Sequence, residues 1–202
     1  RWYCLRGGRV GRRRAFSFHH ALCFVLHFGT IMDQRIVGFE PVVDNKTSIL
    51  IVGSMPGRES IRRNEYYGHP RNRFWPMIET VLGIPSTLPY AERLQALNDS
   101  GVGLWDVLSS CERQGSSDAY IQVESEVYNE FASMLDARRR IRTICCNGMK
   151  AYGAFSRQIL PTIDISIAER LDTIRLPSTS AANATYLYED IVRLWAIALL
   201  DV

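Results

Sequence analysis

The chain has 202 residues and a mass of 23.0 kDa; 47% of its residues are hydrophobic and 22% are charged, which allows a buried core and excludes a disordered or fibrous protein. The formal charge of +3 is uneven, because residues 1–31 hold six arginines and no acid, whereas residues 32–202 hold 18 basic and 21 acidic side chains. Since this larger part carries a net charge of −3, a local basic patch must bind any polyanionic partner.

Residues 1–31 differ in composition from the remainder of the chain. We expect them to be a basic leader that is disordered or absent from the native protein, with Met32 as the start of a single domain over 32–202. The alternative is a targeting segment, because the arginines at 12–14 precede an apolar stretch, as in a secretory signal. That stretch is interrupted by His27 and Gly29 and is too short to span a bilayer.

Apolar runs alternate with amphipathic segments along residues 32–202. The run at 48–52 (SILIV) is continuous and rich in β-branched residues, which predicts a strand buried on both faces. Similar runs predict strands at 102–108, 141–146 and 171–176. Helices are expected at 74–82, 89–97, 124–137, 149–160 and 186–200. Strands that alternate with helices indicate a parallel sheet covered on both faces, in one α/β domain.

The cysteine and histidine content argues against a metal or disulfide protein. Residues 32–202 contain Cys111, Cys145, Cys146 and a single histidine, His69. An odd number of cysteines with two adjacent is not a disulfide framework, and no pair has the spacing of a zinc site. We therefore expect reduced, buried thiols in a cytoplasmic protein that holds no metal.

Small, polar or amide residues follow each predicted strand. The first strand is followed by GSMPG at 53–57, the second ends in Trp105 and Asp106, the third leads into NGMK at 147–150, and the fourth into PSTSAAN at 177–183. Ligands of open parallel sheets bind beyond the carboxyl ends of the strands. The four ends together predict a binding site, although each alone could be ordinary turn chemistry.

Aromatic and basic residues concentrate at 66–75, in the segment YYGHPRNRFW. Five arginines fall between positions 58 and 73, within a part of the chain that is acidic overall. Arginines bind phosphates and aromatic rings stack on bases, so this segment indicates a nucleic-acid face. The alternative is a solvated basic loop. GSMPG is neither a P-loop nor a nucleophile elbow, because it lacks the G-K-[ST] of the first and the G-x-S-x-G of the second.

The order and spacing of GSMPG, YYGHPRNRFW, LWDVL, NGMKA and LPSTSAAN resemble those of the uracil-DNA glycosylase superfamily, and most closely its hypoxanthine-DNA (deoxyinosine) glycosylase branch. The resemblance covers residues 36–199. It implies a three-layer α/β/α sandwich around a four-stranded parallel sheet. It also implies hydrolysis of the N-glycosidic bond to a deaminated base that is flipped out of DNA, which leaves an abasic site. Water is the nucleophile, so no cofactor is implied; we expect a monomer whose partner is DNA.

The resemblance also implies which residues are catalytic. Many relatives carry Asp or Asn directly after the first glycine of GSMPG, where this chain has Ser54. The deoxyinosine branch shares that departure, and its catalytic residue is the asparagine of HPRN, which corresponds to Asn72. An amide is no strong base, but its carbonyl can orient a water and its NH₂ can bind substrate. Asn72 could instead form a local turn, and Ser54 could orient water or cap the next helix.

Further residues are expected to hold the base or the DNA. Tyr67 is expected to stack on the extruded base, and the backbone at Gly53 and Met55 to face the base or the water. His69, Asp106 and Asn147 could contact the base or serve only the local fold. The expected DNA contacts are Arg58, Arg62, Arg71, Arg73, Ser178, Thr179, Ser180 and Asn183. Phe74 and Trp75 are expected to belong to the core.

Two other functions fit the same residues. A mismatch-specific uracil or thymine glycosylase would use the same chemistry, but Ser54 in place of Asn or Asp argues against efficient uracil excision. A catalytically silent nucleic-acid-binding module would keep the arginines and the stacking tyrosine without needing Asn72. Release of a base, tested with and without Asn72, separates these hypotheses.

Overall fold

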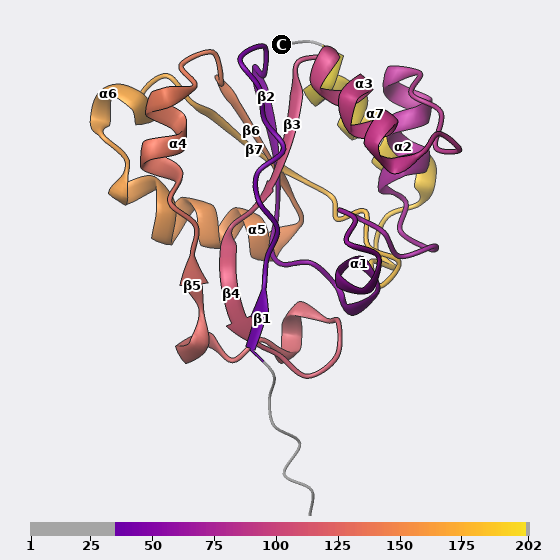
Figure 1. The fold of residues 1–202 in the computed structure, drawn as a ribbon, viewed down its shortest axis with the longest axis horizontal. Helices are drawn as coiled ribbons and strands as arrows, with labels where there is room; N and C mark the ends of the chain where they lie inside the picture. The colour runs from indigo at the N-terminus through magenta and orange to yellow at the C-terminus, as the bar shows by residue number, and fades with distance from the viewer. Residues whose placement is uncertain (1–34, 201–202) are drawn as a thin grey trace, which may run out of the picture. The chain divides into compact units, whose positions relative to one another are not determined.

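A computed structural model describes residues 35–200, which contain two β-sheets and their flanking helices (Figure 1). The larger sheet has the strand order β3-β2-β6-β7, and all of its neighbouring strands are parallel. Its strands are β2 (Ile49–Gly53), β3 (Val102–Asp106), β6 (Thr143–Asn147) and β7 (Asp172–Leu176). The predicted α/β fold with a four-stranded parallel sheet is therefore confirmed, with each strand within two residues of its expected bounds.

Side chains alternate across the central strand β2 and create two cores. Ile49 and Ile51 pack with the helices α2 (Phe74–Leu82), α3 (Tyr90–Asp99) and α7 (Tyr188–Leu200). Leu50 and Val52 pack on the opposite face with α4 (Phe131–Ala137) and α5 (Met149–Ala154). Figure 1 shows these two groups of helices on either side of the sheet. Since every β2 side chain is buried, its apolar run has no polar alternation.

The second sheet was not predicted. It is antiparallel, with the strand order β1-β4-β5, and consists of β1 (Arg35–Val37), β4 (Leu108–Glu112) and β5 (Val127–Tyr128). The strand expected over 102–108 stops at Asp106, and the chain enters β4 after one residue. At this break, Val107 N–H donates to the Gly53 carbonyl at 2.9 Å, so the backbone leaves the parallel sheet without losing its hydrogen bond.

The helix expected over 124–137 is wrong in its first half. Residues 124–130 contain the end of a 3₁₀ turn (Val123–Ser125) and strand β5, and α4 begins only at Phe131. Val127 was expected on the buried helix face but lies in the strand, 46% exposed, and its carbonyl accepts from the Ser109 hydroxyl. The pairing of this segment with β4 overrides its helical periodicity.

Three helical segments also depart from the expected pattern. The short helices α1 (Arg58–Arg63) and α6 (Ile165–Ala168) were not predicted. The expected helix at 149–160 is α5 followed by a π-helical turn and a 3₁₀ turn, Phe155–Ile159 and Leu160–Thr162. These changes leave the topology of the sheet unaltered.

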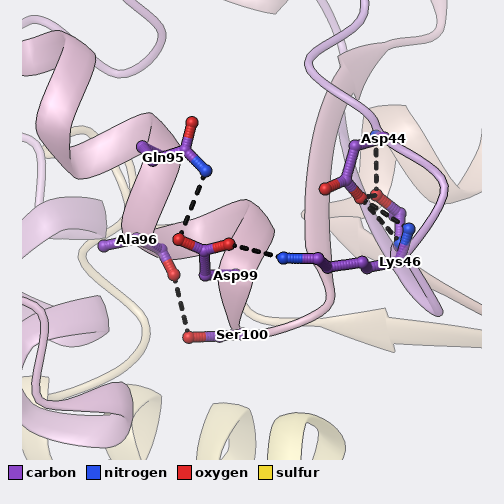
Figure 2. Close-up of polar contacts among 7 residues, drawn as sticks. Asp44, Lys46, Gln95, Ala96, Asp99 and Ser100 are labelled. Carbon is purple, nitrogen blue, oxygen red and sulfur yellow. Dashed lines mark hydrogen bonds and ion pairs between the residues drawn. The ribbon is translucent and has the colours of Figure 1, made fainter.

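Polar contacts connect the segments that precede β2 and β3, at the end of the sheet where these strands begin (Figure 2). The Asp44 carboxylate accepts from the backbone N–H groups of Lys46 and Thr47 and so closes the turn before β2. Lys46 Nζ lies 2.9 Å from Asp99 Oδ1 at the end of α3. Both side chains are exposed, so this ion pair contributes little to stability. The carboxyl ends of the parallel strands, with the polar residues that follow them, lie at the opposite end of the sheet.

The remaining expectations about burial are met in the part that the structure describes. Cys111, Cys145 and Cys146 are free and buried, and Phe74 and Trp75 belong to the core. None of the helices between residues 35 and 200 combines the length and the apolarity needed to cross a bilayer. The expected leader at 1–31 lies outside the described residues.

Candidate functional site

A cleft of about 1070 Å³ opens where the four parallel strands end. Its walls come from the segments 53–57, 66–72, 116–118, 147–149 and 175–183, together with Asp106. The cleft brings together every residue that the sequence predicted for the site except Arg58, Arg62 and Arg73. The topology explains this, because parallel strands place all their carboxyl ends at one edge.

Gly53, Asp106 and Tyr67 meet in the cleft at the ends of β2 and β3. A Cβ atom on Gly53 would lie 2.3 Å from Asp106 Oδ1 and 3.3 Å from the Tyr67 hydroxyl, so only glycine leaves space for both. Asp106 is 3% exposed, and its Oδ2 has no hydrogen-bond partner among residues 35–200. The Tyr67 ring stacks on Phe74 with centroids 3.8 Å apart, and the Tyr67 backbone takes a left-handed φ of 56°. The cleft thus combines an aromatic wall with a buried carboxyl.

Burial raises the pKa of Asp106 to about 7; repulsion from Asp118 adds to the rise, and Arg113 opposes it. Between pH 4 and 7 the unfolded chain loses a proton that the folded chain keeps, so stability falls as pH rises through this window. We expect Asp106→Asn to stabilise the fold relative to wild type above pH 7, by up to about 4 kcal/mol, and to have little effect below pH 4. Denaturant unfolding across pH 3.5–8.5 measures this difference, and a constant difference would contradict the prediction.

The HPRN segment forms a tight turn at the start of α2. Asn72 N–H donates to the His69 carbonyl at 2.8 Å, and Arg71 N–H donates to His69 Nδ1 at 3.1 Å. The Asn72 side-chain carbonyl accepts from Phe74 N–H at 3.0 Å. The expected local turn is therefore present, and it fixes the orientation of an amide that also lines the cleft.

Asn147 and Thr179 join the end of β6 to the loop at 177–183. Asn147 Oδ1 accepts from Thr179 N–H at 2.9 Å, and Asn147 Nδ2 donates to Thr179 Oγ1 at 3.0 Å. Asn183 Nδ2 donates to the Ser178 carbonyl at 2.7 Å and closes the loop on itself. Gly148 has a φ of 99°, and a Cβ there would lie 3.0 Å from that of Ser178. These side chains give the loop a fixed shape.

The predicted DNA-binding arginines have different surroundings. The Arg73 guanidinium donates to the backbone carbonyls of Ser180 and Asn183, so it also holds this loop, and to that of Tyr186 just beyond it. Arg62 forms an ion pair with Glu59 at 2.6 Å. Arg58 and Arg71 are exposed. Of the four arginines predicted to bind DNA, Arg58 and Arg71 therefore carry the most accessible positive charge.

The loop at 113–120 was not predicted to be part of the site. Ser116, Ser117 and Asp118 line the cleft, and Ser54 Oγ donates to Asp118 Oδ2 at 2.7 Å. Arg113 is 2% exposed; its NH2 group donates to the Pro56 carbonyl at 2.5 Å, and its NH1 group lies 3.8 Å from Asp118 Oδ1. The loop carries no periodic pattern, so only its density of Ser and charged residues could have signalled a site.

Residues 35–200 include no cluster of three or more His, Cys, Asp or Glu side chains that could hold a metal ion. The cleft instead offers amide, hydroxyl, carboxyl and aromatic groups. Such a set can stack on a planar ring, bind its polar edge and orient a water molecule.

Comparisons with known proteins agree with this geometry. A family model described as "Uracil DNA glycosylase superfamily" matches residues 40–197. A hypoxanthine DNA glycosylase of Methanosarcina barkeri is 39% identical over 115 residues, which are 56% of this chain and 72% of the relative. A hypoxanthine DNA glycosylase of Methanosarcina acetivorans is 36% identical over 152 residues, which are 74% of this chain and 89% of the relative.

A solved structure extends the similarity to three dimensions. It is a solution NMR structure from Methanosarcina acetivorans, of a protein assigned provisionally as a uracil DNA glycosylase. The two structures agree with a TM-score of 0.66 at 32% sequence identity, over 81% of this chain and 98% of that one.

Proposed function

The chain belongs to the uracil-DNA glycosylase superfamily, and we propose from this premise that it hydrolyses the N-glycosidic bond of deoxyinosine in DNA, releasing hypoxanthine and leaving an abasic site. The observation that carries the proposal is the cleft at the strand ends, where the Tyr67 ring, the Asn72 amide and the Asp106 carboxyl line one space. The names of two relatives at 36–39% identity favour hypoxanthine as the base.

The base must leave the helical stack before it can enter such a cleft. Phe74 covers one face of the Tyr67 ring, and the extruded base stacks on the opposite face. Asp106, Gly53 and Met55 contact the edge of the base at the bottom of the cleft, and His69 lies at its side. A buried carboxyl without a partner favours a ligand that offers it a hydrogen bond.

Asn72 and Ser54 act on the reacting bond. The Asn72 side-chain carbonyl accepts from Phe74 N–H, and this bond fixes the orientation of the amide. The NH₂ group can then donate to the substrate, and the second lone pair of the carbonyl can orient a water molecule. Ser54 contributes a hydroxyl beside the same space. Fixed dipoles of this kind stabilise the charge that develops as the glycosidic bond breaks.

The DNA backbone is held by exposed arginines and by the loop at 177–183. Arg58 and Arg71 supply positive charge, and Ser178 and Ser180 supply hydroxyls and backbone N–H groups for phosphates. Arg73, Asn147, Thr179 and Asn183 act indirectly, because they give the loop its shape. Arg62 adds less, since Glu59 neutralises much of its charge. We also propose that the protein is a cytoplasmic monomer. A monomer leaves the face with the cleft open to a duplex.

End-labelled duplexes that carry one deoxyinosine, one deoxyuridine or one G·T mismatch test the proposal, with alkaline cleavage of abasic sites as the readout. We expect strand scission at deoxyinosine. Scission confined to deoxyuridine or to the mismatched thymine would move the substrate to the mismatch-specific alternative. Tight DNA binding without scission on any duplex would favour the silent binding module.

A further inference from the structure

Hydrolysis of a glycosidic bond releases a proton from the attacking water, and Asn72 cannot accept it, because a carboxamide is not basic at neutral pH. A carboxylate in the cleft would take that proton more readily than bulk water does. We propose that Asp118 is this general base, with the Ser54 hydroxyl as the positioning group that orients its carboxylate. This inference rests on the proposed function and assigns a role to a residue outside the sequence motifs.

The contacts of Asp118 suit this role. Its Oδ2 accepts from Ser54 Oγ at 2.7 Å, and its Oδ1 lies 3.8 Å from the Arg113 guanidinium. A carboxylate has about four lone-pair positions, so these two contacts leave acceptor capacity for a water. The Asp118 side chain is 38% exposed, and it lines the same cleft as Tyr67 and Asn72. It is thus both fixed and open to a small molecule.

The other titratable groups of the cleft are less suited to accept a proton. Glu59 is bound by Arg62 and Arg63, which hold the pKa of its carboxyl at about 2. His69 Nδ1 accepts from Arg71 N–H, so the neutral ring carries its proton on Nε2 and is a donor at that atom. Asp106 Oδ2 has no partner that would stabilise an anion. Asp118 therefore remains as the carboxylate of the cleft that has stabilising partners and keeps a pKa high enough to accept a proton.

Charged groups on several elements face Asp118. Burial raises the pKa of Asp118, and Glu126 before β5 adds to the rise, whereas the Ser54 hydroxyl, Arg113 after β4 and Lys150 on α5 oppose it. Asp106 at the end of β3 repels Asp118 in turn. Because Asp118 has the guanidinium and the serine hydroxyl, and Asp106 Oδ2 is unpartnered, the negative charge of this pair is favoured on Asp118.

The proposed step balances as a hydrolysis. The water oxygen forms a bond to C1′ of the deoxyribose as the C1′–N9 bond breaks, and the electron pair of that bond leaves with hypoxanthine. The proton lost by the water passes to the Asp118 carboxylate and from there to solvent. The hypoxanthine anion takes a proton from solvent, which completes the free base and the abasic sugar.

Asp118→Asn tests the base directly, because an amide keeps an acceptor for Ser54 but cannot take a proton. Single-turnover release of hypoxanthine is measured from pH 5 to 9. We expect a loss of about 10²–10⁴-fold at neutral pH and the disappearance of the fall in rate on the acidic side. Binding to a duplex with 2′-fluoro-deoxyinosine, which resists cleavage, is expected to stay within threefold of wild type. Asp136→Asn on α4, an exposed carboxylate paired with Arg139, is the matched control and should leave the profile unchanged.

Asp118→Ala with added formate separates a chemical role from a structural one. The half-exposed position admits a small carboxylate, and we expect formate to restore at least tenfold of the lost rate. Ser54→Ala removes the orienting bond together with the hydroxyl proposed beside the reacting bond, but it keeps the Asp118 carboxylate. It should therefore lose less than Asp118→Asn and keep the acidic limb. The inference is overturned if wild type is active and Asp118→Asn keeps its rate, or if the rate falls while the acidic limb persists and formate has no effect. If wild type releases no hypoxanthine, the proposed function itself fails and the inference falls with it.

Discussion

Asn72→Ala is expected to lower the single-turnover rate of hypoxanthine release by about 10²–10³-fold, the usual effect of removing one fixed dipole at a developing charge. The substitution also removes the acceptor for Phe74 N–H at the start of α2, which costs about 1 kcal/mol of stability. Rate and unfolding must therefore be measured on the same preparations, with deoxyinosine duplexes and denaturant titrations.

Asn72→Asp is the matched control for the two roles of this side chain. A carboxylate still accepts from Phe74 N–H, so the stability of the Asp variant should lie near that of wild type. It lacks the NH₂ group, so excision should fall if that group binds substrate. If Asn72→Ala releases hypoxanthine at the wild-type rate, Asn72 serves only the turn and the catalytic proposal for it is wrong.

Gly53→Ala should have a comparable effect for a steric reason. The added methyl group would lie 2.3 Å from Asp106 Oδ1, and Asp106 is buried and has little room to move. We expect a loss of about 1–3 kcal/mol in the free energy of unfolding. The rate should fall by about 10²-fold, because the carboxyl and the neighbouring Tyr67 hydroxyl are displaced. Thermal unfolding and single-turnover kinetics measure the two effects.

Gly57→Ala provides a comparison within the same loop. A Cβ on Gly57 would meet only Ser116 atoms at 3.8 Å or more, and its φ of −72° suits any residue. Its effect on both measurements should be far smaller than that of Gly53→Ala. Equal effects for the two glycines would indicate that the loop needs flexibility, and the steric explanation would be refuted.

The sequence was sufficient for the parallel sheet because burial on both faces leaves a strong local signal. The run at 48–52 has no polar alternation, and the structure places it at the centre of the sheet as β2. Strands β4 and β5 left no such signal. Val127 in β5 is exposed, and its pairing with β4 depends on tertiary contacts rather than on its own pattern.

The residues of the site also divide into those that the sequence predicted and those that it did not. Gly53, Asp106 and Asn147 were expected to lie together because each is near or directly after the end of a predicted strand, and the cleft contains all three. Asp118 lies 64 residues from Ser54, at the start of a short 3₁₀ turn (Asp118–Tyr120), so no local sequence pattern could predict their hydrogen bond. The interactions of Arg73 with backbone carbonyls were equally hidden, because its neighbours in sequence indicated a phosphate contact instead.

The loop at 177–183 is attached by Asn147 to β6 and by Arg73 to the turn before α2. In the proposed complex, a duplex would therefore meet a preorganised surface, because the ordering entropy of the loop was lost when the chain folded. Freezing a mobile side chain on binding costs about 0.5–1.5 kcal/mol, and here the intramolecular hydrogen bonds have already imposed that cost. If the loop binds DNA as proposed, we expect folding stability and DNA affinity to be linked through one set of bonds, so that a substitution that loosens these bonds weakens both.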